Sequence, residues 1–380
     1  MTIPAASACR PAAQAAMNAS FTGTFTVTFP MRRLAALLAL AVASSGAHAG
    51  APLRLLTWAD YAPKDVIAQF KKETGIEVQV TLATNEEMIS KLRATGGAGY
   101  DLANPSQDRI TGPALEFGIY QPIDLARVKV AQFAPAMFEA SRQVTSLKGK
   151  MYGLPLFWGT DGLLVNIKRA KIADYGDLCN AEWSGKTALR LKRPTLIAFA
   201  FSMGMDPFKA YDDPKKYEAI IQAAGAKLIA CKKHLKYFWE SKDQLLNDLR
   251  SGELVGAMMW DAGAWKLNAE TANMKYLAPR SGALGWVDTM AIPAKAKNLD
   301  GVYQWINFVS RPEIAARLAK AAGTFTAIEG ADALMAPKMK AQLAESFPNG
   351  ALQQIHWYPA IPTGLEEIDG KMLDRIKASN

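Results

Sequence analysis

The sequence predicts an α/β fold made of two lobes joined by strands. Apolar strand-like runs alternate with helical patterns through residues 53–103, an order that favours a mainly parallel sheet. Residues 152–166 read as two apolar strands without a helix between them, which we interpret as a crossing into a second lobe, and residues 286–293 as the return. With 380 residues, 50% of them hydrophobic, the chain is long enough to build two cores.

We expect the first lobe to comprise residues 50–157 and 288–330. Its predicted elements follow in order: a strand over 53–57, a helix from Pro63 to Glu73, a strand over 76–80, a helix capped by Asn85, and a short strand over 100–103. In parallel sheets, ligands lie beyond the carboxyl ends of the strands. The loops 58–61 and 106–108 follow the first and third strands, so they are candidate ligand loops.

The second lobe is expected over residues 158–287 and 331–380. Its predicted elements are a strand over 187–191, helices after Pro194 and after Pro214, a capped helix from Ser241, and a strand over 255–260. Helices over 299–310 and 312–322 would pack on the first lobe, and the final helix, 364–377, is amphipathic. Two crossings made of strands predict a hinge, about which the lobes close around a ligand.

The N-terminal stretch predicts export. Residues 31–49 combine a short basic start, an apolar run and a small-residue cleavage pattern, so we interpret them as a cleaved signal peptide and Met31 as the start of translation. Residues 1–30 would then be an extension without a structural role. After cleavage, Cys179 and Cys231 remain as an even pair in an oxidising compartment, and they are expected to form a disulfide.

Charge and motif content exclude several functions. The formal net charge of +9 includes three arginines ahead of position 50, and no basic block with interleaved aromatic residues indicates nucleic-acid binding. An exported hydrolase is the main alternative, but beyond the leader only His234 and His356 remain, and no Gly-x-Ser-x-Gly motif is present. No His/Cys cluster has metal-ligand spacing, so neither a metal nor another cofactor is expected.

A tryptophan and a carboxylate lie two residues apart in the strand-like run 285–293. Side chains two apart on a strand share a face, so Trp286 and Asp288 are directed into the same space. An aromatic face beside a carboxylate suits an organic cation. A purely structural or adhesive exported protein remains a third alternative, but it does not explain repeated Trp-plus-Asp pairs at strand ends.

Motifs of one pattern are spread over nearly the whole mature chain: Leu56–Tyr61 with Phe70–Ile76, Tyr100–Leu102 with Pro105 and Ser106, Tyr152–Pro155 with Trp158 and Gly159, Met259 with Trp260, and Trp286–Ala294. Together they resemble the periplasmic solute-binding proteins of ABC transporters, most closely the spermidine/putrescine-binding family. The resemblance implies a type II periplasmic-binding-protein fold. It also implies a monomeric, non-enzymatic receptor that closes on a small amine and presents it to an inner-membrane ABC permease.

The resemblance also implies a set of ligand-binding residues. The aromatic walls would be Trp58, Tyr61, Trp260 and Trp286, and Asp288 would anchor an ammonium group. The remaining candidates are polar or acidic positions at strand ends and in the hinge, together with neighbouring residues: Asp60, Ser106, Gln107, Asp108, Asp161, Arg193, Thr195, Asp261 and Phe325.

One segment departs from the family pattern. Where polyamine binders carry acidic residues after the second-lobe strand, this chain has Arg190, Lys192 and Arg193. Basic groups in contact with a cation would repel it. Either these side chains turn outward, or the ligand carries an acid group as well as an amine, as in a γ-aminobutyrate-like, opine-like or aminophosphonate compound.

Overall fold

A continuous sheet runs through both halves of the molecule in the computed structural model, which describes residues 51–334 and 337–379. Its strands follow the order β2-β1-β3-β12-β7-β10-β8-β9. These strands are β1 (Leu53–Thr57), β2 (Val78–Leu82), β3 (Leu102–Ala103), β7 (Gly153–Asn166), β8 (Thr187–Leu189), β9 (Tyr237–Phe238), β10 (Gly256–Trp260) and β12 (Leu284–Pro293). The predicted two-lobe α/β fold is confirmed, while the exact lobe boundaries stay a prediction. The predicted extension and signal peptide lie outside the described residues.

The first lobe is built around β1, which pairs in parallel with both β2 and β3. Its helices are α1 (Lys64–Thr74), α2 (Asn85–Thr95), α3 (Thr111–Phe117), α4 (Pro135–Thr145), α9 (Leu299–Val309) and α10 (Pro312–Ala322). The cap of α2 was predicted wrongly, since the Thr84 side chain, rather than that of Asn85, accepts the hydrogen bond from the Glu87 amide and completes a capping box. This frees the Asn85 side chain for another contact.

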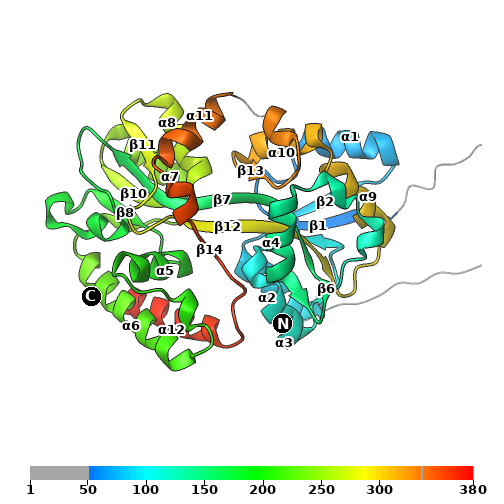
Figure 1. Cartoon of the computed structure of the whole chain (residues 1–380), viewed down its shortest axis with the longest axis horizontal. Helices are drawn as coiled ribbons and strands as arrows, with labels where there is room; N and C mark the ends of the chain where they lie inside the picture. Colours follow the sequence, from blue (N-terminus) through cyan, green and yellow to red (C-terminus); the bar gives the residue numbers. More distant parts are fainter. Residues whose placement is uncertain (1–50, 335–336, 380) are drawn as a thin grey trace, which may run out of the picture. The chain divides into compact units, whose positions relative to one another are not determined.

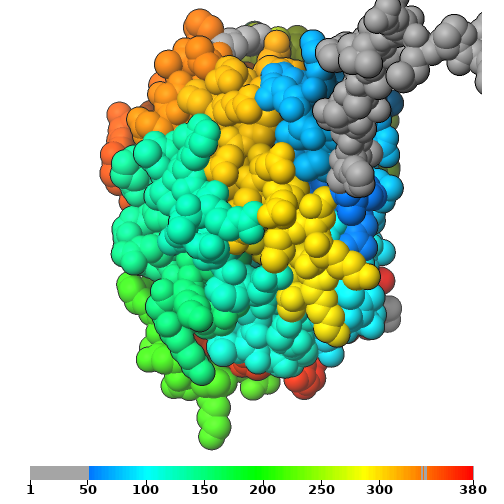
Figure 2. Space-filling model, turned by 90° about the vertical axis from the view of Figure 1, so that its right-hand side faces the viewer, coloured from blue at the N-terminus to red at the C-terminus, as the bar shows by residue number. Residues whose placement is uncertain are grey.

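Distant segments meet on the outer face of the first lobe. Figure 2 shows the yellow chain after β12 lying between the blue N-terminal segment and the blue-green segment that precedes β7. Hydrogen bonds fix this arrangement: the Lys129 amide donates to Asn307, and Arg311 pairs with Glu73 at 2.7 Å. The return of the chain through β12 therefore completes the first lobe.

The second lobe surrounds β10 and β8, which pair in parallel, as do β8 and β9. Its helices are α5 (Arg193–Ser202), α6 (Pro214–Lys232), α7 (Lys242–Ser251), α8 (Asp261–Glu270), α11 (Pro337–Ser346) and α12 (Leu365–Ala378). Helix α12 lies along α5 and α6 (Figure 1). The predicted disulfide between Cys179 and Cys231 is confirmed in this lobe.

Two long antiparallel strands, β7 and β12, connect the lobes (Figure 1). The prediction of two strands within residues 152–166 was wrong, because Gly159 and Gly162 do not turn the chain. They are small where a neighbour approaches closely: a Cβ on Gly162 would lie 2.6 Å from the Tyr276 hydroxyl oxygen. Strand β12 carries an irregularity between Asp288 and Thr289, at the middle of the crossing.

Short strands complete the architecture. β4 (Tyr120–Gln121) and β14 (His356–Trp357) pair with β12, β11 (Met274–Leu277) and β13 (Phe325–Thr326) pair with β7, and β5 (Ser146–Leu147) pairs with β6 (Lys150–Met151). Within residues 51–334 and 337–379, no helix combines the length and the apolar character needed to cross a membrane.

Candidate functional site

A cavity of about 390 Å³ lies where the strand ends of the two lobes face each other. This volume is in the range of small-molecule sites. It is lined by these predicted site residues: Trp58, Asp60, Tyr61, Ser106, Asp108, Asp161, Arg193, Trp260, Trp286 and Asp288. Loops after β1, β3, β8 and β10 and the crossing strands therefore bring together residues that are up to 230 positions apart in the sequence.

Asp288 is the centre of the first-lobe wall, by which we mean Trp58, Tyr61, Ser106 and Asp288. Its carboxylate accepts hydrogen bonds from the Tyr61 hydroxyl at 2.5 Å and from the Ser106 hydroxyl at 2.6 Å. Ser106 is held in turn by Asn85, whose side-chain amide donates to the serine oxygen at 3.0 Å. Burial raises the pKa of Asp288 to about 6, against the lowering effect of these two hydroxyl donors.

The aromatic members of this wall are fixed by contacts on their far sides. The Trp58 indole N–H donates to the Asn104 carbonyl at 2.8 Å, and the Tyr61 ring packs edge-on against Phe157 at 4.6 Å between centroids. The connecting loop contains Asp60 in the left-handed backbone region, with φ of 68°. A tight turn after β1 therefore presents both rings to the cavity.

The second-lobe wall consists of Asp161, Arg190, Lys192 and Trp260. Asp161 on β7 is paired in register with Trp260 at the end of β10, and β10 lies beside β8, after which Arg190 follows. Burial raises the pKa of Asp161 to about 7; the positive charge of Arg190 opposes this rise, and the charge of Asp288 adds to it. A carboxyl group on each wall thus belongs to one electrostatically coupled site.

Trp286 lines the cavity from β12, directly opposite Gly159 on β7. A Cβ at position 159 would lie 2.3 Å from the Cζ2 atom of Trp286. The indole therefore occupies its place because residue 159 has no side chain. This explains physically why a glycine stands in the middle of a buried strand.

Four predicted ligand residues lie outside the cavity lining. The buried carboxylate of Asp261 accepts hydrogen bonds from the Thr160 amide and hydroxyl at 2.7 and 2.9 Å, and Phe325 stacks on Trp158 at 4.4 Å. The Gln107 amide donates to the Tyr358 carbonyl at 3.3 Å. The Thr195 hydroxyl donates to the Arg190 carbonyl, so it fixes the turn that carries Arg190.

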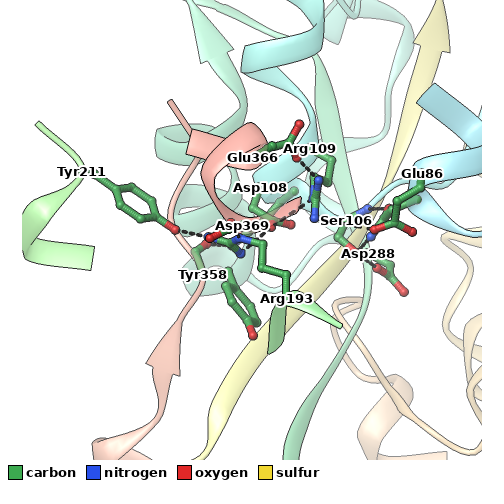
Figure 3. A network of polar contacts seen from close by, with 12 residues as sticks. Glu86, Ser106, Asp108, Arg109, Arg193, Tyr211, Asp288, Tyr358, Glu366 and Asp369 are labelled. Carbon is green, nitrogen blue, oxygen red and sulfur yellow. Dashed lines mark hydrogen bonds and ion pairs between the residues drawn. The ribbon is translucent and has the colours of Figure 1, made fainter. Parts of the chain in front are cut away.

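The three basic residues after β8, Arg190, Lys192 and Arg193, differ in their partners. Arg190 and Lys192 line the cavity. Arg193 also reaches it, but its guanidinium is only 6% exposed and is bound by Asp369 of α12 at 2.8 Å, with Asp108 of the first lobe at 3.6 Å (Figure 3). The charge of Arg193 is therefore balanced within the protein.

Several lining residues were not among the predicted site residues, notably Glu86, Arg109, Lys242 and Tyr358. Tyr358 follows the two-residue strand β14, and Arg109 pairs with Glu366 at the start of α12 (Figure 3). The aromatic run His356–Tyr358 was the available signal for this segment. The periodicity of this run did not indicate that the segment returns to the strand ends of the first lobe.

Comparisons with known proteins agree with the geometry. Residues 65–345 match the family model described as bacterial extracellular solute-binding protein. The spermidine/putrescine-binding periplasmic protein 1 of Haemophilus influenzae is 31% identical over 83% of this chain and 86% of its own length, and the corresponding Escherichia coli protein is 29% identical over 85% and 92%.

A solved structure of a spermidine/putrescine ABC transporter protein from Listeria monocytogenes shares the fold, with a TM-score of 0.75 and 24% identity over 87% of this chain and 99% of its own. The named relatives are periplasmic, which confirms the location predicted from the leader. By the extent of the family match and the identity to its relatives, the chain belongs to the family of bacterial extracellular solute-binding proteins.

Proposed function

We propose that this protein is the periplasmic receptor of an ABC importer and captures a small organic amine, such as putrescine or spermidine, in the cavity between its lobes. The observation that carries the proposal is Asp288, a buried carboxylate that accepts hydrogen bonds from two hydroxyl groups and lines the same cavity as the rings of Trp58, Tyr61 and Trp286. The ligands are those in the names of its relatives.

The recognition chemistry follows from these groups. An alkylammonium ion gains from the negative face of an aromatic ring and from a charge-assisted hydrogen bond to a carboxylate. Micromolar affinity requires about −8 kcal/mol, which two ring contacts and one or two such bonds supply after the ordering of the ligand. Binding and release without chemical change suffice for a transport receptor.

Closure of the lobes would form contacts at the seam between them, where the loop after β3 meets the C-terminal segment of the second lobe. The Asp108 carbonyl accepts a hydrogen bond from the Ile361 amide at 3.2 Å, and Arg109 pairs with Glu366, so first-lobe loops contact the C-terminal segment of the second lobe. We propose that the ligand favours this joined arrangement, and that a monomeric closed receptor delivers the ligand to the permease.

The test is titration calorimetry of Asp288→Asn with putrescine and spermidine. We expect at least a tenfold loss of affinity, because the ammonium group loses its ionic partner while the side chain keeps its size. Trp286→Ala should also lose at least tenfold. The matched control is Asp300→Asn, which removes an exposed first-lobe carboxylate paired with Arg127 outside the cavity. Affinity unchanged in both cavity variants would refute the site.

A further inference from the structure

The basic groups around the cavity are not equivalent. Arg193 is neutralised by Asp369 at 2.8 Å, and Arg109 by Glu366, with Glu86 at 3.7 Å (Figure 3). These two guanidinium groups have protein carboxylates as partners and connect α5, α12 and the loop after β3. They can be assigned to the joining of the lobes rather than to a ligand.

Arg190, Lys192 and Lys242 line the same cavity, but they differ from Arg193 and Arg109 in their ion pairing. Within the described parts of the chain, none of the three has a carboxylate within 4.0 Å. The Nε atom of Arg190 is buried and has no hydrogen-bond partner among the described residues. A half-buried guanidinium with a buried, unpartnered Nε donor is unfavourable in the free protein, and an incoming anion would relieve this.

Arg190 is nevertheless held firmly in position. Its guanidinium lies over the rings of Trp239 and Trp260, at 5.3 and 5.4 Å from their centroids. Its backbone carbonyl accepts hydrogen bonds from the Thr195 hydroxyl and from the Lys192 amide. Indole rings stabilise the cation without occupying its N–H donors. Arg190 is thus held in position while its Nε donor has no partner among the described residues, as in a preformed binding site for a carboxylate or phosphonate.

A structural role for Arg190 as the counter-ion of Asp161 is the competing explanation. The two groups influence each other electrostatically, yet they form no ion pair within 4.0 Å. Opposite charges that share a small cavity without pairing create a dipolar site. A linear diamine anchored at Asp288 would bring its second ammonium group into the cavity that Arg190, Lys192 and Lys242 also line, and like-charge contact at a desolvated site is unfavourable.

We infer that the ligand carries an acid group as well as an amine, as in an ω-amino acid or aminophosphonate, with the ammonium at Asp288 and the acid group at Arg190. Lys192 and Lys242 add positive charge around the acid group. The inference rests on the proposed function, since it assumes an amine receptor and narrows the class of amine. It also explains why the second-lobe wall departs from the acidic pattern of polyamine binders.

The experiment compares ligands of equal length by titration calorimetry: 1,4-diaminobutane, 4-aminobutanoate and 3-aminopropylphosphonate. We expect at least one of the two acid-bearing compounds to bind at least tenfold more tightly than the diamine. Arg190→Gln should weaken the acid-bearing ligand at least tenfold without weakening the diamine. The control is Arg250→Gln, which removes a guanidinium of the same lobe that pairs with Glu270 outside the cavity, and it should change neither affinity.

The outcomes separate the two proposals. Tighter binding of the diamine, or equal acid-bearing affinity in Arg190→Gln and wild type, would overturn the inference and leave the amine receptor standing. Failure of all three compounds to bind would overturn the proposed function itself. The ranking of ligands on the unmodified protein is decisive even if Arg190→Gln does not fold. The double variant Lys192→Gln with Lys242→Gln provides a second test of the positive charge in the cavity.

Discussion

On the first-lobe wall, the carboxylate of Asp288 accepts hydrogen bonds from two hydroxyl groups before any ligand arrives. On the second-lobe wall, the guanidinium of Arg190 lies over indole rings, and its Nε donor has no partner in the described part of the chain. The first wall combines aromatic rings with an aspartate, and the second places Arg190 and Lys192 beside the carboxyl group of Asp161. One fold can therefore keep the anchor for an ammonium group on one lobe while the other lobe decides what the rest of the ligand must be.

The two walls face one cavity because the lobes are joined at the seam. Replacing Arg193, the buried cation at this seam, should have the largest effect on the protein. In Arg193→Met the carboxylate of Asp369, itself 2% exposed, keeps one hydrogen bond from the described residues, donated by Tyr217 at 2.7 Å. An uncompensated buried charge destabilises a protein by about 3–5 kcal/mol. We expect the thermal midpoint of the ligand-free protein to fall by several degrees.

A matched substitution separates this effect from a general loss of arginine. Arg142→Met breaks an exposed pair with Glu139 on α4, and such pairs contribute about 0–1 kcal/mol. Its midpoint should stay close to that of the wild type. Equal midpoints for Arg193→Met and Arg142→Met would show that the buried pair of Arg193 and Asp369 does not stabilise the folded protein.

The aromatic part of the site can be displaced without replacing any charged residue. In Gly159→Ala the new methyl group would overlap the Trp286 ring and would approach the Oδ1 atom of Asp261 to 2.9 Å, so the indole must move. We expect at least a tenfold loss of amine affinity by calorimetry. Gly176→Ala is the control, because its methyl group would meet only the Ser202 hydroxyl at 3.7 Å. Equal affinity in both variants would show that Trp286 adapts or does not contact the ligand.

Local rules in the sequence predicted several residues that the structure brings to the cavity. Strand ends in an alternating α/β pattern pointed to the loops of Trp58 and Ser106, and the two-residue spacing placed Trp286 and Asp288 on one face of a strand. Trp286 and Asp288 both line the cavity. The predicted export similarly led to the predicted disulfide, because two cysteines in an oxidising compartment usually pair with each other.

The contacts of the other candidate residues depend on partners that are distant in the sequence, and no local pattern reveals these partners. Asp261 directly follows a cavity-facing tryptophan, but α8 begins there, and the carboxylate turns away to Thr160. Arg193 and Lys192 are neighbours in the sequence, yet only Arg193 meets a carboxylate, because α12 returns to the lobe more than 170 residues later. Charge type could be predicted from the sequence, whereas charge pairing required the fold.

The smallest expected effect concerns pH and follows from the raised pKa of Asp288, about 6 in the folded protein against about 4 in an unfolded chain. An ammonium ligand requires the ionised carboxylate, so affinity should rise as the pH increases through 6 and level off above 7. At pH 5 this group alone would lower affinity by about tenfold. Calorimetry from pH 5 to 8 measures the rise, and binding near pH 6 should release a proton from Asp288.

The same shift has an opposite consequence for the ligand-free protein. Between about pH 4 and 6 the folded state holds a proton on Asp288 that the unfolded chain has already released, so this group's contribution to folding stability falls as the pH rises through that window. Asp288→Asn should remove this part of the decline, measured as the difference in thermal midpoint between variant and wild type at each pH. Asp300→Asn should not. Wild-type affinity that is flat from pH 5 to 8 would show that the carboxylate of Asp288 does not anchor the ammonium group.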